Sequence, residues 1–180
     1  MVGVVLAGGA GRRMGGDKPA RSLCGRPMAA YVADALGVVC ARVALVGSGP
    51  RLPGVELWDD EPAEPRHPRT GIVHALGRAG EEVLVCAGDM PFVTPQPLRE
   101  LAAAGGDAVA VADGVLQPVL ALYTPAALPV FAAAEPGEPL TRTVERLDPI
   151  RVTMPAGQAR SVDTPEELAA AEAELRGEAR

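Results

Sequence analysis

Short apolar runs alternate along the chain with segments in which apolar residues recur at helical spacing. The first run, Val2–Leu6, contains no polar side chain and predicts a fully buried strand. Helices are expected over Pro27–Leu36, where the proline is tolerated in the opening turn, and over Thr70–Ala79. The further predicted strands are Arg42–Val46, Val55–Trp58, Val83–Cys86, Ala108–Ala112, Val119–Leu122 and Ile150–Thr153.

This alternation favours an α/β fold of three layers, in which a mostly parallel, twisted sheet carries helices on both faces. Three more helices are expected where threonine precedes proline, at Thr94, Thr124 and Thr164. Threonine can cap free N–H groups, and proline suits the first helical position. Glu167 completes a capping box with Thr164. We expect one domain over residues 1–176 and a loose tail over residues 177–180.

A glycine-rich stretch, Leu6–Lys18, directly follows the first predicted strand. Five of its thirteen residues are glycine, so its backbone can adopt positive φ and approach a ligand closely. Several N–H groups of such a loop can point into one concavity and bind an anion. Arg12, Arg13 and Lys18 add three cations, and Lys18 is the only lysine of a chain with sixteen arginines. We therefore expect a triphosphate here.

The stretch differs from two better-known phosphate loops. Asp17 stands where a Walker loop requires its lysine, and Met14 stands where a dinucleotide fingerprint requires its third glycine. The actual pattern, L-A-G-G-x-x-x-R-M-G-x-D-K, is similar to the signature of nucleotidyltransferases. Within them it most resembles the molybdenum cofactor guanylyltransferase family.

The resemblance covers most of the chain, because G-D-M-P-F, Q-P-x-x-A-L-Y and D-T-P-E-E-L follow in the family's order. It implies a Rossmann-like nucleotidyltransferase fold. It also implies catalytic roles for Lys18 on the α-phosphate, for Arg13 on the departing phosphates and for Asp89. The nucleotide contacts that it implies in the glycine-rich stretch are Leu6, Ala7, Gly8, Gly9, Gly11, Arg12 and Lys18.

Acidic residues follow several predicted strands. Asp59 and Asp60 come after one strand, Asp89 after another, and Asp163 after a short run that ends at Val162. Ligands of an open parallel sheet bind outside the carboxyl ends of its strands, so these carboxylates are expected to converge where the triphosphate lies. Mg²⁺ relieves their repulsion, since it takes one or two carboxylates together with phosphate oxygens. We therefore expect Mg²⁺ as the cofactor.

Two aspartates are the expected metal ligands. Asp89 matches the family's metal-binding aspartate, and the alternative is a residue that caps a turn. Asp163 matches the second metal ligand of the related cytidylyltransferases, whereas guanylyltransferases usually carry asparagine there. The chain contains no asparagine at all. The choice between GTP and CTP therefore stays open at this position, and so does a purely helix-starting role for Asp163.

Asp59 and Asp60 bear on which nucleotide base the site recognises. A carboxylate can accept hydrogen bonds from both N1–H and the 2-amino group of guanine, a pairing that cytosine cannot offer in the same form. The alternative is a solvated acidic turn. The resemblance also places Gly71 near the nucleotide, in a segment where Arg69 departs from the family's pattern. His67, in the same segment, is expected to be solvated, and the alternative is a contact with substrate.

Composition bears on the make-up of the core, on possible partners and on the cellular compartment. Aromatic residues make up only 3% of the 180 residues, so the core must consist of Ala, Val and Leu. The net charge of -6 argues against nucleic acid as a partner. Cys24, Cys40 and Cys86 are widely spaced and indicate buried thiols in a reducing cytosol. No leader and no apolar run of about 18 residues is present, so we expect a cytoplasmic protein without membrane contact.

These features favour an enzyme that joins GMP from GTP to the phosphate of molybdopterin by Mg²⁺-assisted in-line attack and releases pyrophosphate. The resemblance also implies transient contacts with other cofactor-biosynthesis proteins or with molybdoenzymes. One alternative is the same chemistry with CTP, disfavoured by Gly8-Gly9, where cytidylyltransferases usually read A-A-G. Others are transfer onto a sugar 1-phosphate and a non-catalytic regulatory module, against which Lys18 and Asp89 argue.

Overall fold

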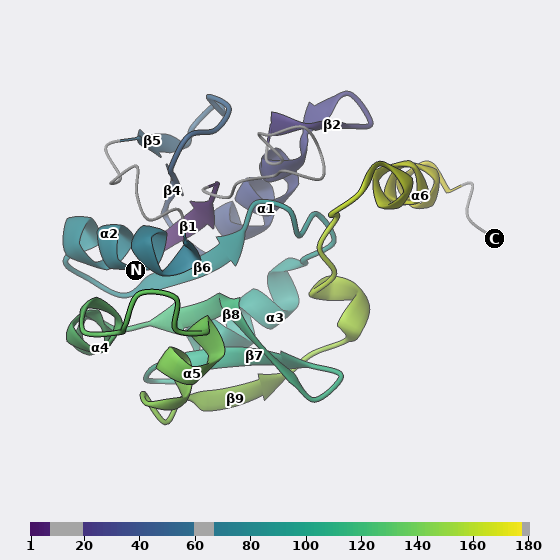
Figure 1. Cartoon of the computed structure of the whole chain (residues 1–180). Coiled ribbons are helices and arrows are strands. Elements are labelled where there is room, and N and C mark those ends of the chain that lie inside the picture. The colour runs from purple at the N-terminus through teal and green to yellow at the C-terminus, as the bar shows by residue number, and fades with distance from the viewer. Residues whose placement is uncertain (8–19, 60–66, 178–180) are drawn as a thin grey trace.

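One seven-stranded sheet organises the molecule (Figure 1). The structure is a computed structural model that describes residues 1–7, 20–59 and 67–177. The strand order is β5-β4-β1-β6-β8-β7-β9. The strands are β1 (Val2–Leu6), β4 (Arg42–Val46), β5 (Glu56–Trp58), β6 (Val83–Ala87), β7 (Ala108–Ala112), β8 (Val115–Tyr123) and β9 (Ile150–Thr153). The predicted mostly parallel sheet is therefore confirmed.

β8 is the strand that differs most from the prediction. It runs antiparallel to both β6 and β7, whereas the other neighbouring pairs of this sheet are parallel. It also begins at Val115 and not at Val119. Asp113 and Gly114 both adopt positive φ, at 50° and 75°, and form a two-residue hairpin turn between β7 and β8.

Helices cover both faces of the sheet, which confirms the three layers. The α1 and α3 helices pack on the face that presents Val5 and Leu84, whereas α2, α4 and α5 pack on the face that presents Val4 and Val85 (Figure 1). These side chains alternate along β1 and β6 because successive residues of a strand point to opposite faces. The helices are α1 (Met28–Gly37), α2 (Pro68–Ala79), α3 (Pro95–Ala102), α4 (Leu128–Ala132) and α5 (Leu140–Glu145).

The last helix, α6 (Pro165–Leu175), lies to one side of the sheet, against a small hairpin of β2 (Ser22–Leu23) and β3 (Arg26–Pro27) (Figure 1). A third apolar cluster joins them. Its fully buried members are Leu23, Met28, Val162 and Ala171.

The three Thr-Pro pairs begin helical segments, but they do so by different contacts. Thr164 forms the predicted capping box of α6, in which its hydroxyl accepts from the N–H of Glu167 at 3.2 Å. Thr94 precedes α3, yet its hydroxyl donates to Gln158 Oε1 at 2.6 Å and caps no N–H group. Thr124 precedes a 3₁₀ turn, Pro125–Ala127, that leads directly into α4, again without a side-chain cap. The sequence pattern therefore predicts the three helix starts correctly, but only one of the three predicted threonine caps is formed.

The expectations about thiols and membrane spans can be compared with the described residues. Cys40 and Cys86 are buried thiols as expected, whereas Cys24 is half-buried. Within residues 1–7, 20–59 and 67–177, no helix has the length and apolar character needed to cross a membrane.

Candidate functional site

The carboxyl ends of four parallel strands lie side by side at one edge of the sheet. Past the strand ends, the N–H of Ala7 donates to Val46 O at 2.9 Å, and the N–H of Gly88 donates to Leu6 O at 3.0 Å. Leu6 and Ala7 are both buried at the end of β1. These two predicted nucleotide-binding residues therefore sit in the middle of the edge, between β4 and β6.

Several predicted site residues lie outside the described residues. They are Gly8, Gly9, Gly11, Arg12, Arg13 and Lys18 of the glycine-rich stretch, and Asp60. Their roles stay predictions.

Asp89 lies in the turn that follows β6, at the same edge. The N–H of Met90 donates to Ala87 O at 3.2 Å, which closes this turn. Gly88 is buried and Asp89 is half-buried. The Asp89 carbonyl accepts a hydrogen bond from the N–H of Val162 at 2.9 Å. The segment that carries the second predicted metal ligand is thus bound to the turn that carries the first.

Asp163 follows Val162 immediately and is half-buried. Its carboxylate oxygen Oδ2 accepts from the Ser161 hydroxyl at 2.5 Å. Its N–H donates to Glu167 Oε2 at 2.6 Å, so the first turn of α6 also fixes its backbone. The backbone of Asp163 is therefore anchored on both sides. The preceding residue, Val162, binds the Asp89 carbonyl, and Glu167 of α6 binds the N–H of Asp163.

The donor set at this edge suits a hard divalent cation. Among the residues that the structure describes, no three or more His, Cys, Asp and Glu side chains are grouped as a metal cage. Mg²⁺ does not need such a cage, because it usually keeps waters and takes one or two carboxylates plus phosphate oxygens. Asp89 and Asp163, held together through Val162, fit that requirement by their chemistry.

Asp59 is exposed directly after β5. The preceding residue, Trp58, is only 2% exposed, and its carbonyl accepts from the N–H of Gly47 at 3.0 Å. The indole of Trp58 donates to Glu56 Oε2 at 3.1 Å, and the Arg78 guanidinium carbon lies 5.1 Å from its ring centroid. This strand end is therefore well anchored, and it presents Asp59 to solvent at the predicted edge.

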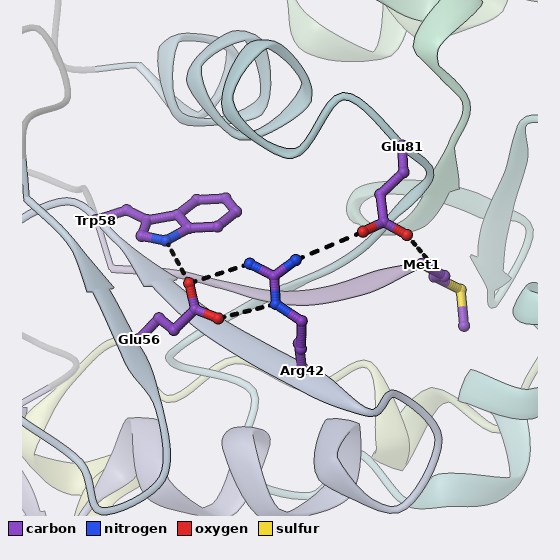
Figure 2. A network of polar contacts seen from close by, with 5 residues as sticks. All are labelled: Met1, Arg42, Glu56, Trp58 and Glu81. Carbon is purple, nitrogen blue, oxygen red and sulfur yellow. Dashed lines mark hydrogen bonds and ion pairs between the residues drawn. The ribbon is translucent and has the colours of Figure 1, made fainter.

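Polar contacts around Arg42 tie β5 to the rest of the sheet (Figure 2). Arg42 binds Glu56 through two nitrogens, at 3.0 and 3.3 Å, and its Nη1 lies 3.7 Å from Glu81 Oε1. The hydrogen bonds from Arg42 and then Trp58 hold the pKa of Glu56 below its ordinary value. Glu81 also binds the amino group of Met1. These partly exposed pairs orient the edge strand and contribute little free energy individually.

The start of α2 differs from the prediction. The helix begins at Pro68, two positions before the predicted Thr70, because His67 acts as its N-cap: Nδ1 accepts from the N–H of Arg69 at 3.2 Å. His67 is half-buried, and burial, followed by the charge of Arg69, lowers its pKa. The expectation that His67 is merely solvated was wrong. Gly71, a predicted nucleotide contact, is buried in this first turn.

Arg69 is a residue whose structural role the sequence did not reveal. Its Nη1 donates to the carbonyls of Ala134 and Glu135, the latter at 3.2 Å, just after α4. Arg69 thus ties the start of α2 to the chain between α4 and α5. Its partners lie more than sixty positions away, so only its departure from the family's pattern marked it as unusual.

Gly49, in the turn after β4, lies close to Leu45 and Ala7, which the sequence did not predict. A methyl group at Gly49 would lie 2.9 Å from Leu45 Cδ2 and 3.0 Å from Ala7 Cβ. Real Cβ atoms essentially never show contacts under 3.0 Å, and a distance of 3.0 Å is already tighter than nine in ten. Glycine therefore lets this turn fold back onto Ala7 at the base of the glycine-rich stretch.

Several known sequences are similar to this chain over almost its whole length. The family model described as "MobA-like NTP transferase domain" matches residues 3–150. A molybdenum cofactor guanylyltransferase of Cereibacter sphaeroides is 36% identical, and the match covers 99% of both chains. The enzyme of the same name from Rhodobacter capsulatus is 34% identical over 98% of this chain and 97% of its own.

Solved structures show the same fold. The molybdopterin-guanine dinucleotide biosynthesis protein A of Archaeoglobus fulgidus superposes with a TM-score of 0.75 at 25% identity, covering 98% of this chain and all of its own. The 2-C-methyl-D-erythritol 4-phosphate cytidylyltransferase of Thermus thermophilus gives a TM-score of 0.73 at 19% identity, covering 96% of this chain and 98% of its own. The second similarity concerns the fold alone and carries no information on the base.

Proposed function

The chain belongs to the molybdenum cofactor guanylyltransferase family of MobA-like NTP transferases, and we propose that it transfers GMP from GTP to the phosphate of molybdopterin. It is a nucleotidyltransferase, and the open points are its nucleotide, its metal and its acceptor. The observation that carries the proposal is the match to curated guanylyltransferases over 99% of the chain at 36% identity. The carboxyl edge of the sheet supports it, because Leu6, Ala7 and Asp89 lie there together.

The proposed nucleotide site is the glycine-rich stretch with the ends of the neighbouring strands. Backbone N–H groups of the stretch would bind the phosphates, and Arg12 would add charge there. Asp59 and Asp60 would accept from the guanine edge, beyond the buried Trp58. The remaining proposed contacts are Leu6, Ala7, Gly8, Gly9, Gly11, Lys18 and Gly71.

Asp89 and Asp163 would hold a divalent cation, for which Mg²⁺ is the proposed identity. When bound, such an ion would neutralise part of the phosphate charge. The contact between Val162 and Asp89 supports a shared role, since it holds the two carboxylate-bearing segments together. Ser161 and Glu167 orient Asp163 from either side.

The proposed reaction is an in-line displacement. A phosphate oxygen of molybdopterin forms a bond to the α-phosphorus of GTP while the bond from that phosphorus to the bridging oxygen breaks, and pyrophosphate leaves with the electron pair. Lys18 would stabilise charge on the α-phosphate, and Arg13 would hold the departing phosphates. No covalent enzyme intermediate is required, so positioning and electrostatic stabilisation supply the catalysis.

CTP is the second candidate nucleotide, and Asp163 favours it, because cytidylyltransferases carry aspartate at this place. The curated relatives favour GTP. Calorimetric titration of the purified protein with GTP, CTP and ATP, each with Mg²⁺, separates the two. We expect preferential binding of GTP that weakens when Asp59 or Asp60 is replaced by asparagine. A preference for CTP would contradict the guanylyl assignment.

A further inference from the structure

The third apolar cluster connects α6 with the β2–β3 hairpin, α1 and the segment before Asp163. We call Leu23, Met28, Val162 and Ala171, each at most 1% exposed, the α6 cluster. Leu23 lies in the hairpin that follows the glycine-rich stretch, and Val162 directly precedes Asp163. Phe92, three residues after Asp89, packs against the same cluster. One small cluster is thus adjacent in sequence to the phosphate loop and to both proposed metal ligands.

Glu172 binds the tip of the hairpin to α6. Its Oε1 accepts from the N–H of Cys24 at 3.1 Å, and its carbonyl accepts from the Cys24 thiol at 3.7 Å. Cys24 and Gly25 adopt positive φ, at 50° and 81°, so the hairpin turns at the point where α6 holds it. The Tyr31 hydroxyl donates to Leu23 O at 2.8 Å and supports the turn from the side of α1.

Arg160 binds α6 to the turn that carries Asp89. Its guanidinium carbon lies 4.0 Å from the ring centroid of Phe92, and its Nη2 donates to Glu174 Oε2 at 2.6 Å. Cation–π contacts of this kind stabilise modestly at partly exposed sites. Together with the hydrogen bond from Val162 to Asp89, they connect the start of α6 to the turn that carries Asp89, while Glu172 connects α6 to the β2–β3 hairpin.

The attachment of α6 is nevertheless small. Within Pro165–Leu175, all of which the structure describes, Ala171 is the only fully buried residue. Segments with few buried apolar contacts open locally at a lower free energy than the core of the same protein. The docked and undocked positions of α6 are therefore expected to differ by less free energy than the folded and unfolded states of the sheet.

We propose that α6 is a clasp for the nucleotide and metal site, and that Glu172 is its positioning residue. The inference rests on the proposed function. A metal–nucleotide complex that touches Asp89 and Asp163 at once binds the docked state better than the undocked one, because docking of α6 holds these two segments together. It must then shift the population toward docking, and undocking must weaken its binding by the same factor.

Cys24 offers a direct measurement of docking. It is half-buried and its N–H and thiol both bind Glu172, so undocking exposes it. The other two thiols are buried in the core, and burial raises the pKa of Cys40 to about 11 and that of Cys86 further. Since the thiolate is the reactive form, alkylation of the folded protein is expected to start at Cys24.

The experiment measures iodoacetamide alkylation of Cys24 in the full chain, assigned by peptide mass spectrometry, without ligand and with Mg²⁺ and GTP. In the wild-type protein we expect saturating Mg²⁺ and GTP to slow the reaction about fivefold or more. E172A loses the acceptor for the Cys24 N–H, so alkylation without ligand should accelerate by up to about tenfold. E172A should also raise KM for GTP while keeping kcat. E172Q retains an acceptor oxygen and should stay close to wild type.

R176A is the matched control, because Arg176 binds the other carboxylate oxygen of Glu172, at 2.8 Å, and leaves the oxygen that holds Cys24 in place. Its alkylation rate should resemble that of wild type. If GTP binds by calorimetry but leaves Cys24 alkylation unchanged, the clasp is overturned and the proposed function stands. If alkylation of E172A equals that of wild type, Glu172 has no positioning role. If no nucleoside triphosphate binds, the proposed function fails, and the clasp fails with it.

Discussion

The backbone N–H of Val162 donates a hydrogen bond to the carbonyl of Asp89 over 2.9 Å, across a separation of more than seventy positions in the sequence. Val162 is itself 1% exposed and belongs to the α6 cluster. The bond therefore lies inside packed structure, where it is protected from competition with water. It holds Asp163 next to the turn that carries Asp89, so the two proposed metal ligands are positioned by one backbone contact.

The two aspartates are expected to respond unequally to replacement. Asp89→Asn should lower kcat on the order of 100-fold or more, because a carboxylate that neutralises a divalent cation cannot be replaced by a neutral amide. Asp163→Asn should have a much smaller effect, since guanylyltransferases usually carry asparagine there, and its amide oxygen can remain a ligand while Asp89 supplies the negative charge. Steady-state kinetics at several Mg²⁺ concentrations measure both. Equal losses in the two variants would indicate that the metal requires the charge of both carboxylates, as in the cytidylyltransferase-like alternative.

Lys18→Ala should lower kcat by about 10²–10³-fold, the usual cost of losing one preorganised charge in a transition state. Binding of GTP should weaken far less, because the other cations of the stretch remain. Lys18→Arg is the informative control: a planar guanidinium does not reproduce a compact ammonium, so it should restore only part of the rate. Single-turnover measurements separate the chemical step from binding. Wild-type turnover in Lys18→Ala would remove Lys18 from the mechanism.

Gly3 in β1 is expected to be essential for packing. A methyl group there would lie 3.1 Å from Leu36 Cβ and 3.3 Å from Cys40 Sγ. Gly3→Ala should therefore lower the free energy of unfolding by about 1–3 kcal/mol, as overpacking does. Gly77→Ala is the matched control, because Gly77 is exposed in α2 with nothing within 4 Å. It should raise the free energy of unfolding by about 0.5–1 kcal/mol.

Urea denaturation followed by circular dichroism measures both glycine variants. If Gly3→Ala is as stable as wild type, α1 can shift away from β1 without loss, and the close approach of the two elements is not required.

The sequence was sufficient where a local pattern determines the structure. Apolar runs located the strands, and Asp89 and Asp163 were selected because they follow strand-like runs and match family motifs. The direction of β8 could not be read from hydrophobicity, since a strand that is covered on both faces is an apolar run whether it is parallel or antiparallel to its neighbours. The Asp113-Gly114 pair was a turn signal that the prediction did not use.

Contacts between distant segments account for the other differences. Thr94 donates to Gln158 and does not cap its own helix. Arg69 reaches the chain after α4. Neither partner can be inferred from the residues around Thr94 or Arg69, because each contact exists only after the sheet has brought separate segments together. His67 was missed for another reason: histidine is an unusual N-cap, although its position before Pro68 resembled the three Thr-Pro pairs.

His67 leads to a prediction on pH. Its Nδ1 can accept from the N–H of Arg69 only while it carries no proton. Burial holds its pKa below the ordinary value of 6.5, so as pH falls through 6.5 the unfolded chain binds the proton before the folded protein does. The free energy of unfolding should therefore decrease as pH falls from 6.5 toward the lower pKa of the folded state.

His67→Asn tests this, because asparagine is a good N-cap that does not titrate. The variant should match wild type near pH 7.5 and lose less stability than wild type between pH 6.5 and 5, while His67→Ala should be less stable by about 0.5–2 kcal/mol at pH 7.5. Urea denaturation over this pH range measures all three proteins. Since Gly71 lies in the turn that His67 caps, KM for GTP in His67→Ala should rise as well. If wild type and His67→Asn lose stability in parallel below pH 6.5, another group titrates and the cap does not depend on the charge of His67.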